Sequence, residues 1–472
     1  MILLPNIDID IPNQVSELLN RLDAYSYRAC IVGRCVRELV GGQSVVDFDV
    51  ITNASMERIC AIFDNYSVNV DNIKKGEVII TVLGLPILVS PYRKGWSGDG
   101  IPVYTDDITE DLKRRDFSFN AIAYNPREGF IDPFGGMESL QPIISNAQEY
   151  QDYPDNSDNM EKQGVVKAID ADGVSPFERN PVSILQALGY YSSGEYIISS
   201  ETKDAILRHK ENAKNIPQSE LRTELSWVIR GKRASAVLEE YADVFTVLAP
   251  EFAPLSGFDL KRPEHSYDAL THTFKSVGYA SPVLTLRYAM LFHALGKPDC
   301  FSQDKGGKGH YYGHAERSWI YARRIMSRMG FSEDETDDVG FLIKNQNIEI
   351  APDRRSLKLK LREIPPERLK LLLQFRYADL KAQSPDFEGA AMNCKRQVDA
   401  INEIVAMKEC YTLQQLAVNR YDLMQKGFAA NDEQAAAILE RLFDVVIDAP
   451  AFNTRARLMG IAEKLAQTAF GK

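Results

Sequence analysis

The sequence predicts an α+β protein in which a head of mixed strands and helices precedes a long helical region. Residues 1–140 combine strand-like alternation with helical spacing, and residues 144–175 turn polar and acidic. Beyond them, apolar residues recur at i, i+3 and i+4, and alternation is scarce. At 472 residues the chain exceeds what a single core usually supports, so we expect several domains.

Composition favours a soluble, cytoplasmic protein. Hydrophobic residues make up 44% and charged residues 26%, which is ordinary for a globular chain. No apolar run approaches the roughly 20 residues of a membrane span, and the first residues lack a basic signal-peptide region. We therefore expect no membrane partner. The net charge of −11 argues against a uniformly basic surface, yet a local basic patch still permits a nucleic-acid partner.

The six cysteines are scattered along the chain and form no C-x-x-C pair. Such spacing favours reduced, partly buried thiols over a disulfide framework or a zinc site.

The first elements of the head follow from local patterns. Residues Val15–Leu22 have helical spacing, and Glu77–Leu83 and Pro86–Pro91 read as paired strands around a turn near Gly84. Residues Phe119–Tyr124 form an apolar run that we predict to be another strand.

The stretch Ile31–Asn53 predicts a strand, a glycine turn, a short helix and a second strand that carries Asp47 and Asp49. Because side chains alternate along a strand, both carboxylates point to one face, about 7 Å apart along the chain. Two such carboxylates suit a hard cation such as Mg²⁺. A lone D-x-D pair is common on protein surfaces, so it indicates a metal site only together with its surroundings.

Those surroundings predict a phosphate-binding turn. Gly33 precedes the predicted helix Cys35–Val40, whose first N–H groups and positive dipole end suit a phosphate, and Arg37 lies beside them. A simple tight turn at Gly33 is the alternative. A metal-binding pair opposite a phosphate cradle is the arrangement that nucleotidyl transfer requires.

A second charged motif occurs at Asp111–Tyr124, DLKRRDFSFNAIAY. The guanidinium groups of Arg114 and Arg115 suit triphosphate oxygens, and the carboxylate of Asp116 suits a ribose hydroxyl. Asn120 follows within the same motif. A solvated charged face is the alternative interpretation of the arginine pair.

The C-terminal region carries helical patterns at residues 282–295, 366–383 and 433–448. We find neither a short-period repeat nor coiled-coil heptads. The sequence predicts no oligomeric state.

Several motifs resemble one known family. VGRCVREL, DFDVITNA, DLKRRDFSFNAIAYNP and DPFGGMESL resemble the class II tRNA nucleotidyltransferases and bacterial poly(A) polymerases, the CCA-adding enzymes of the polymerase β-like superfamily. HSYDALTHTF, LRYAMLFHALGKP and HYYGHAERS resemble the HD-type helical domain of many bacterial members. The resemblance implies a nucleotidyltransferase head (1–140), an acidic linker (141–175), a helical neck (176–255), an HD-like body (256–380) and a helical tail (381–472).

The resemblance also implies an activity and its residues. A Mg²⁺-dependent enzyme would add CMP and AMP from CTP and ATP to the 3′ acceptor end of tRNA and release pyrophosphate. Asp47 and Asp49 would be the catalytic metal ligands. The implied nucleotide-binding residues are Gly33, Arg34, Arg37, Arg114, Arg115, Asp116, Asn120 and Asn180.

The chain departs from the family pattern at several of these positions. Arg34 and Glu38 occupy a glycine and an aspartate of the family's GGxVRD motif, and Leu88 occupies the position of a third carboxylate. In the base-reading motif, Asn180 and Ser183 replace an aspartate and an arginine. Ser183 is too short to replace a bidentate guanidinium.

These departures leave two alternatives to the transferase. The chain is then either a catalytically impaired paralogue that binds tRNA-like RNA, or a transferase with another choice of nucleotide or acceptor.

The HD-like region supports a scaffold better than a hydrolase. His272, His293 and His314 match metal-ligand positions, but Ala294 replaces the aspartate that should follow His293. Hydrolysis by this domain type needs the His-Asp pair. We therefore expect packed or capping histidines.

Overall fold

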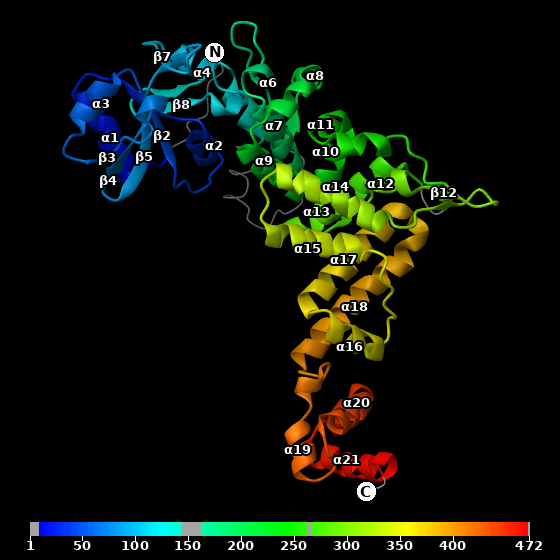
Figure 1. Ribbon diagram of the computed structural model, residues 1–472. Coiled ribbons are helices and arrows are strands. Elements are labelled where there is room, and N and C mark those ends of the chain that lie inside the picture. Colours follow the sequence, from blue (N-terminus) through cyan, green and yellow to red (C-terminus); the bar gives the residue numbers. More distant parts are fainter. Residues whose placement is uncertain (1–8, 144–162, 263–265, 471–472) are drawn as a thin grey trace. The chain divides into compact units, whose positions relative to one another are not determined.

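The computed structural model in Figure 1 describes residues 9–143, 163–262 and 266–470. The chain divides into two compact units, Met1–Pro250 and Glu251–Lys472. Among the described residues, no helix combines the length and the apolar character needed to cross a bilayer. The finer division into head, linker, neck, body and tail stays a prediction.

A seven-stranded mixed sheet forms the centre of the head. Its spatial order is β3 (Ser67–Asn69), β4 (Val78–Val82), β5 (Leu85–Pro91), β2 (Phe48–Thr52), β1 (Ala29–Val32), β8 (Ala123–Asn125) and β9 (Gly129–Ile131). The β2–β5 pair is parallel, and the other pairs are antiparallel. The α+β class with a mixed sheet at the N-terminus is thus confirmed.

The β4–β5 hairpin lies where alternation predicted it. Its two turn residues have positive φ angles, 47° at Leu83 and 87° at Gly84. Two successive residues in this region are the signature of the tight hairpin turn whose twist matches that of the strands. The hairpin places the β5 strand beside β2, which carries Asp49.

Helices cover the sheet. The predicted helix at Val15–Leu22 is α1 (Asn13–Ala24), and it buries Val15, Leu18, Leu19 and Leu22. It packs against β1 and β4. The head also contains α2 (Arg34–Val40), α3 (Met56–Ile62), α4 (Ile108–Lys113) and the β6–β7 pair (Arg93–Trp96 and Pro102–Tyr104).

The strand predicted at Phe119–Tyr124 is wrong over its first four residues. Residues Ser118–Asn120 form a 3-10 turn, and β8 starts only at Ala123. The apolar run misled the prediction because Phe119 is buried against Tyr190 and Tyr196, at centroid distances of 4.9 and 5.3 Å, rather than within a strand ladder. An apolar run alone does not distinguish these states.

The rest of the first unit is helical apart from one small sheet. Its helices are α6 (Pro176–Arg179), α7 (Val182–Ser193), α8 (Ser200–Arg208), α9 (Gln218–Arg230), α10 (Ala234–Glu240) and α11 (Ala242–Leu248). Within the predicted linker, residues 144–162 lie outside the described part of the chain. The described remainder contains β10 (Gly164–Val166), which pairs in parallel with β11 (Tyr196–Ile198). Strand structure therefore reaches into the region predicted to be linker and helical neck.

The second unit consists of helices and one short hairpin. Its helices are α12 (Ala269–Tyr279), α13 (Leu284–Phe292), α14 (His314–Arg328), α15 (Glu333–Lys344), α16 (Arg354–Glu363), α17 (Pro366–Gln383), α18 (Glu388–Ala406), α19 (Arg420–Gln425), α20 (Asp432–Asp448) and α21 (Arg455–Phe470). The hairpin joins β12 (Ser302–Gln303) to β13 (Gly309–His310). Helices α13, α17 and α20 lie where the i, i+3, i+4 pattern predicted them. All six cysteines are free thiols, as predicted.

Candidate active site

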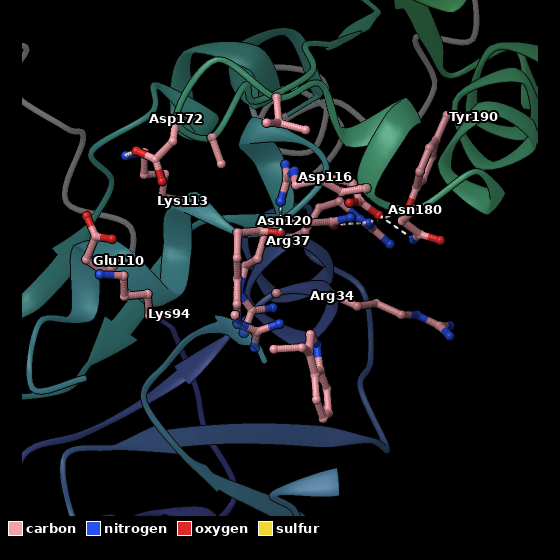
Figure 2. Close-up of a pocket in the computed structure, with 18 residues that line it drawn as sticks. Arg34, Arg37, Lys94, Glu110, Lys113, Asp116, Asn120, Asp172, Asn180 and Tyr190 are labelled. Carbon is pink, nitrogen blue, oxygen red and sulfur yellow. Dashed lines mark hydrogen bonds and ion pairs between the residues drawn. The ribbon is translucent and has the colours of Figure 1, made fainter. Parts of the chain in front are cut away.

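All eight nucleotide-binding residues predicted from the sequence line one cavity of the first unit (Figure 2). Its volume is about 880 Å³. Ten charged side chains line it, and seven of them are cationic: Arg34, Arg37, Lys94, Lys113, Arg114, Arg115 and Arg179, against Glu110, Asp116 and Asp172. A cavity with this excess of positive charge suits a polyanion such as a nucleoside triphosphate.

Gly33 is required by the geometry of the turn before α2. Its φ of 81° lies in a region that L side chains rarely adopt. A Cβ atom at Gly33 would lie 3.0 Å from a terminal guanidinium nitrogen of Arg115. The glycine thus allows an arginine of the second motif to approach the start of α2, so that both predicted phosphate-binding elements border the same space.

Arg37 is held in place by neighbours from two other elements. Its Nη1 donates hydrogen bonds to Asn120 Oδ1 at 2.5 Å and to Tyr190 Oη at 2.7 Å. Its guanidinium lies over the rings of Phe119 and Tyr190, 5.5 and 5.1 Å from their centroids. Because Asn120 fixes Arg37 by its side-chain oxygen, the two predicted nucleotide residues act as one preorganised group.

Asp111 is a site residue that the sequence reasoning missed. Its carboxylate is fully buried and accepts hydrogen bonds from Arg114 Nε at 3.3 Å and Arg115 Nη2 at 3.4 Å. The backbone N–H of Arg93 donates to it at 2.8 Å. The signal was present, because residues spaced i, i+3 and i+4 on a helix lie side by side. Burial lowers the pKa of Arg114 to about 10, so this arginine keeps its charge at neutral pH.

Arg34, which occupies the position of a family glycine, does not obstruct the cavity. Its side chain is 69% exposed and pairs with Glu38, one helical turn further on. The two departures at Arg34 and Glu38 therefore compensate each other. The ion pair raises the pKa of the Arg34 guanidinium, and the hydrogen bond that Arg34 donates to Glu38 is the main cause.

The predicted metal ligands lie outside the cavity lining. Asp49 is the second residue of β2 and is partly buried, whereas Asp47 directly precedes the strand and is exposed. Burial raises the pKa of the Asp49 carboxyl, and the charge of Arg115 opposes that shift. Asp49 thus interacts electrostatically with an arginine that does line the cavity.

Leu88 stands directly beside Asp49 in the sheet. The parallel register pairs Asp49 with Leu88, and Ile79 follows on the next strand. Paired residues point to the same face, so a carboxylate at position 88 would face the Asp49 carboxylate. Within the described chain, the single group of three or more metal-ligating side chains lies elsewhere, and no third such ligand joins Asp47 and Asp49.

Asn180 and Ser183 both bind Asp116. Asn180 Nδ2 donates to Asp116 Oδ2 at 3.0 Å, and Ser183 Oγ donates to the same oxygen at 2.5 Å. Asn180 lines the cavity, whereas Ser183 is fully buried and does not. Burial raises the pKa of Asp116, although both hydrogen bonds act to lower it. Of these two positions, Asn180 alone lines the cavity.

The histidines of the HD-like region separate into two groups. His272 and His293 lie together with Asp379, a residue that the sequence reasoning missed. His314 is not a member of this group; its Nδ1 lies 2.6 Å from the Tyr311 carbonyl, and burial lowers its pKa to about 4. The signal for Asp379 was an acid inside the apolar helical pattern of residues 366–383.

Comparison with known proteins gives the head a family. A model of the poly A polymerase head domain matches residues 29–144. The CCA-adding enzyme of Anoxybacillus flavithermus is 28% identical over 248 residues, which cover 51% of this chain and 56% of that enzyme. The CCA-adding enzyme of Geobacillus thermodenitrificans is 26% identical over 292 residues, or 60% and 63% of the two chains. In these matches the chain spans little more than half the length of its curated relatives.

Solved structures share the fold along nearly the whole chain. The Bacillus stearothermophilus CCA-adding enzyme in complex with CTP superposes with a TM-score of 0.61 at 20% identity, covering 96% of this chain and 97% of that enzyme. The Thermotoga maritima CCA-adding enzyme complexed with tRNA gives 0.59 at 16% identity, with 97% of each chain covered. These comparisons show that residues 29–144 form a poly A polymerase head domain and that the chain shares the fold of the solved CCA-adding enzymes.

Proposed function

We propose that the protein is a nucleotidyltransferase that adds CMP and AMP from CTP and ATP to the 3′ end of tRNA and releases pyrophosphate. One observation carries the proposal: the eight residues predicted from scattered motifs line a single cation-rich cavity, and Asp49 interacts electrostatically with one of its arginines. Relatives named as CCA-adding enzymes, and solved ones in complex with CTP and with tRNA, support the same reaction.

The cavity residues hold and orient the triphosphate. Arg114 and Arg115, anchored on Asp111, present charged N–H groups to the phosphate oxygens, and the turn at Gly33 adds the backbone at the start of α2. Because these groups are fixed before the substrate arrives, they need little reorganisation as negative charge moves to the pyrophosphate.

Asp47 and Asp49 are the residues that would hold Mg²⁺. Their chemistry fits, because Mg²⁺ commonly takes one or two protein carboxylates and completes its shell with water and substrate phosphates. When bound, the ion would neutralise the triphosphate and favour ionisation of the terminal 3′-hydroxyl. Asp49, fixed on β2 beside Leu88, supplies the rigid ligand, and Asp47 supplies the more exposed one.

Asn180 is the group we assign to the base edge. Asn180 lines the cavity, and its Nδ2 donates to Asp116, so the orientation of its amide is fixed and its Oδ1 remains available as an acceptor. Adenine and cytosine both offer an amino donor beside a ring-nitrogen acceptor, a pattern that an amide matches. Because one amide makes fewer contacts than a carboxylate with an arginine, we expect weaker discrimination between nucleotides than a full base-reading pair gives.

A catalytically impaired RNA-binding protein is the second candidate. The specific observation in its favour is Leu88, which places an apolar side chain where it faces Asp49. Under this alternative, the cavity binds a nucleotide or an RNA end without transfer.

Incorporation of labelled nucleotides separates the two candidates. The wild-type chain is incubated with Mg²⁺, tRNA that lacks its 3′ CCA, and each labelled nucleoside triphosphate in turn. The Asp47→Ala/Asp49→Ala variant tests the metal ligands, and Asp64→Asn, an exposed acid of the same domain, is the matched control. We expect labelling by wild type and Asp64→Asn and none by the double variant. Absence of labelling with any nucleotide, with tRNA binding retained, overturns the transferase in favour of the binding protein.

A further inference from the structure

A glutamate one strand beyond Leu88 lies on the same face of the sheet as Asp49. Glu77 directly precedes β4, whose residue Ile79 pairs with Leu88, and Leu88 pairs in turn with Asp49. Because side chains alternate along a strand, Glu77 points to the same face as Ile79. The carboxylates of Glu77 and Asp49 therefore face one side of the sheet, and the apolar Leu88 lies on the strand between them.

The charge of Glu77 acts on Asp49. Burial is the main cause of the raised pKa of Asp49, and the negative charge of Glu77 raises that pKa further. Glu77 has a larger effect than Asp47, the other member of the D-x-D pair. Repulsion between like charges grows as they approach and as solvent is excluded from the space between them. Glu77 thus belongs to the same acidic group as the two aspartates.

Arg93 fixes the position of the Glu77 carboxylate. Arg93 Nη2 donates a hydrogen bond to Glu77 Oε1 at 2.9 Å, and Arg93 Nη1 donates to the Lys75 carbonyl at 2.8 Å. The Arg93 side chain is 7% exposed and that of Glu77 is 25% exposed. Within the described residues, Arg93 is the side chain that binds Glu77, and it uses Oε1 alone. Oε2 therefore remains available to a further donor or cation.

The spacing of the three carboxylates suits an ion that keeps part of its water. The oxygens of Asp47, Asp49 and Glu77 do not all lie within 4.8 Å of one another, so they do not form a compact set of direct ligands. Mg²⁺ loses its water reluctantly and usually retains several water ligands beside one or two carboxylates. A carboxylate beyond direct reach acts on such an ion through its hydration shell.

We propose that Glu77 takes the place of the third carboxylate at the Mg²⁺ site, acting from β4 on the hydration shell of the ion that Asp47 and Asp49 hold. The inference rests on the proposed function for its ion. Leu88 leaves the family position without charge, and Glu77 supplies that charge from the next strand. Groups around the direct ligands of a metal commonly orient it and strengthen its binding.

The alternative role of Glu77 is to hold Arg93 and nothing more. Glu77→Gln separates the two roles, because the amide oxygen of glutamine still accepts a hydrogen bond from Arg93 but carries no charge. If Glu77 only holds Arg93, this exchange leaves metal binding unchanged.

Mn²⁺ binding to the full chain tests the proposal directly. Mn²⁺ replaces Mg²⁺ because the electron paramagnetic resonance signal of free Mn²⁺ falls as the ion binds. Binding that Asp47→Ala/Asp49→Ala removes defines the head site. We expect Glu77→Gln to raise the Mn²⁺ dissociation constant of this site about 10-fold, and the Mg²⁺ concentration for half-maximal incorporation by a similar factor. Glu77→Ser, a second uncharged variant, should show the same loss of Mn²⁺ binding.

Two further variants control for position and for charge. Glu77→Gln/Leu88→Asp moves the carboxylate to β5, beside Asp49, and should return the Mn²⁺ dissociation constant to within about threefold of wild type. Glu128→Gln is the matched control, because Glu128 also pairs with an arginine, Arg28, but at the opposite edge of the same sheet. It should leave Mn²⁺ binding within about twofold of wild type.

Three results overturn the proposal: Mn²⁺ binding that Glu77→Gln and Glu77→Ser both retain, an equal loss in Glu128→Gln, or a wild-type head site that binds no Mn²⁺. Circular dichroism identifies the variants that are folded. Mn²⁺ binding does not require transfer. The expected losses in a wild-type background that incorporates no nucleotide would therefore support Glu77 and overturn the transferase, whereas normal incorporation with unchanged Mn²⁺ binding in Glu77→Gln would overturn the role of Glu77 alone.

Discussion

The head cavity and the histidine cluster of the second unit are opposite kinds of site. The cavity is open, about 880 Å³ in volume, and its groups come from sequence motifs whose members lie a few residues apart. The cluster is buried, small, and built from residues up to 107 positions apart. The cavity has its cations in place but has the apolar Leu88 beside Asp49, whereas the cluster joins two histidines and an aspartate but has Ala294 in place of the acid that hydrolysis needs. From this difference we infer that the head cavity carries out a reaction, whereas the cluster has a structural role in the second unit.

The largest expected effect separates the two sites by activity. Asp49→Asn should lower nucleotide incorporation by about 10³-fold, because it removes the charge that the Mg²⁺ ion needs. Asp379→Asn, the same exchange in the cluster, should leave the incorporation rate within about twofold of wild type. Steady-state incorporation into tRNA measures both. Equal losses of incorporation in the two variants would contradict the assignment of the reaction to the head cavity and of a structural role to the cluster.

Restoring a carboxylate at position 88 should increase the rate of nucleotide incorporation. Leu88→Asp places a carboxylate opposite Asp49 on the same face of the sheet, and we expect incorporation to rise by about tenfold at limiting Mg²⁺. Ile79→Asp is the matched control, since it adds the same group one strand further from Asp49. Both positions are partly exposed, so the cost in stability should be similar. A rate that Leu88→Asp leaves unchanged or lowers would mean that two carboxylates suffice.

Smaller effects should distinguish the two residues that bind Asp116. Asn180→Ala should reduce the preference for CTP and ATP over GTP and UTP by about 10-fold, because it removes the amide that faces the cavity. Ser183→Ala should keep the preference, since that hydroxyl is buried against Asp116. The measurement is kcat/KM for each nucleotide. Equal changes in both variants would contradict the assignment of Asn180 to the base edge.

The smallest effect concerns stability and pH. Burial raises the pKa of Asp49 above its ordinary 3.8, so the folded state binds this proton more tightly than the unfolded chain does. Its stabilising contribution is complete below pH 3.8 and is lost as pH rises through the folded pKa. Asp49→Asn does not ionise and should therefore become more stable than wild type by a small margin as pH increases from 4.5 to 7.5. Thermal melts of both proteins across this pH range measure the effect. If the stability advantage of Asp49→Asn over wild type instead fell with rising pH, the fold would stabilise the ionised Asp49 carboxylate, and this account would be contradicted.

The sequence predicts local arrangements well because they depend on spacing. The β4–β5 hairpin, α17 and the charged motif around Arg114 and Arg115 all follow from residues within one element or one turn. Asp111 was within reach of the same reasoning, because its i, i+3 and i+4 partners are the two arginines.

Contacts between distant elements were beyond sequence reasoning. Asp379 meets His272 only because α17 packs against α12, which no local pattern indicates. The turn at Ser118–Asn120 was misassigned for the same reason, since its aromatic residue is buried against Tyr190 and Tyr196. The Arg34–Glu38 pair, in contrast, is an i, i+4 contact within α2 and was within reach of local reasoning.

The central claim is that the head cavity and the Asp47–Asp49 pair together extend an RNA 3′ end. The most direct measurement is the mass of the 3′-terminal fragment of tRNA lacking CCA after incubation with the full chain, Mg²⁺, CTP and ATP. The account predicts a fragment lengthened by C, C and A with wild type and an unchanged fragment with Asp47→Ala/Asp49→Ala. An unchanged fragment with the wild-type chain, under conditions in which it binds CTP and tRNA, would contradict it.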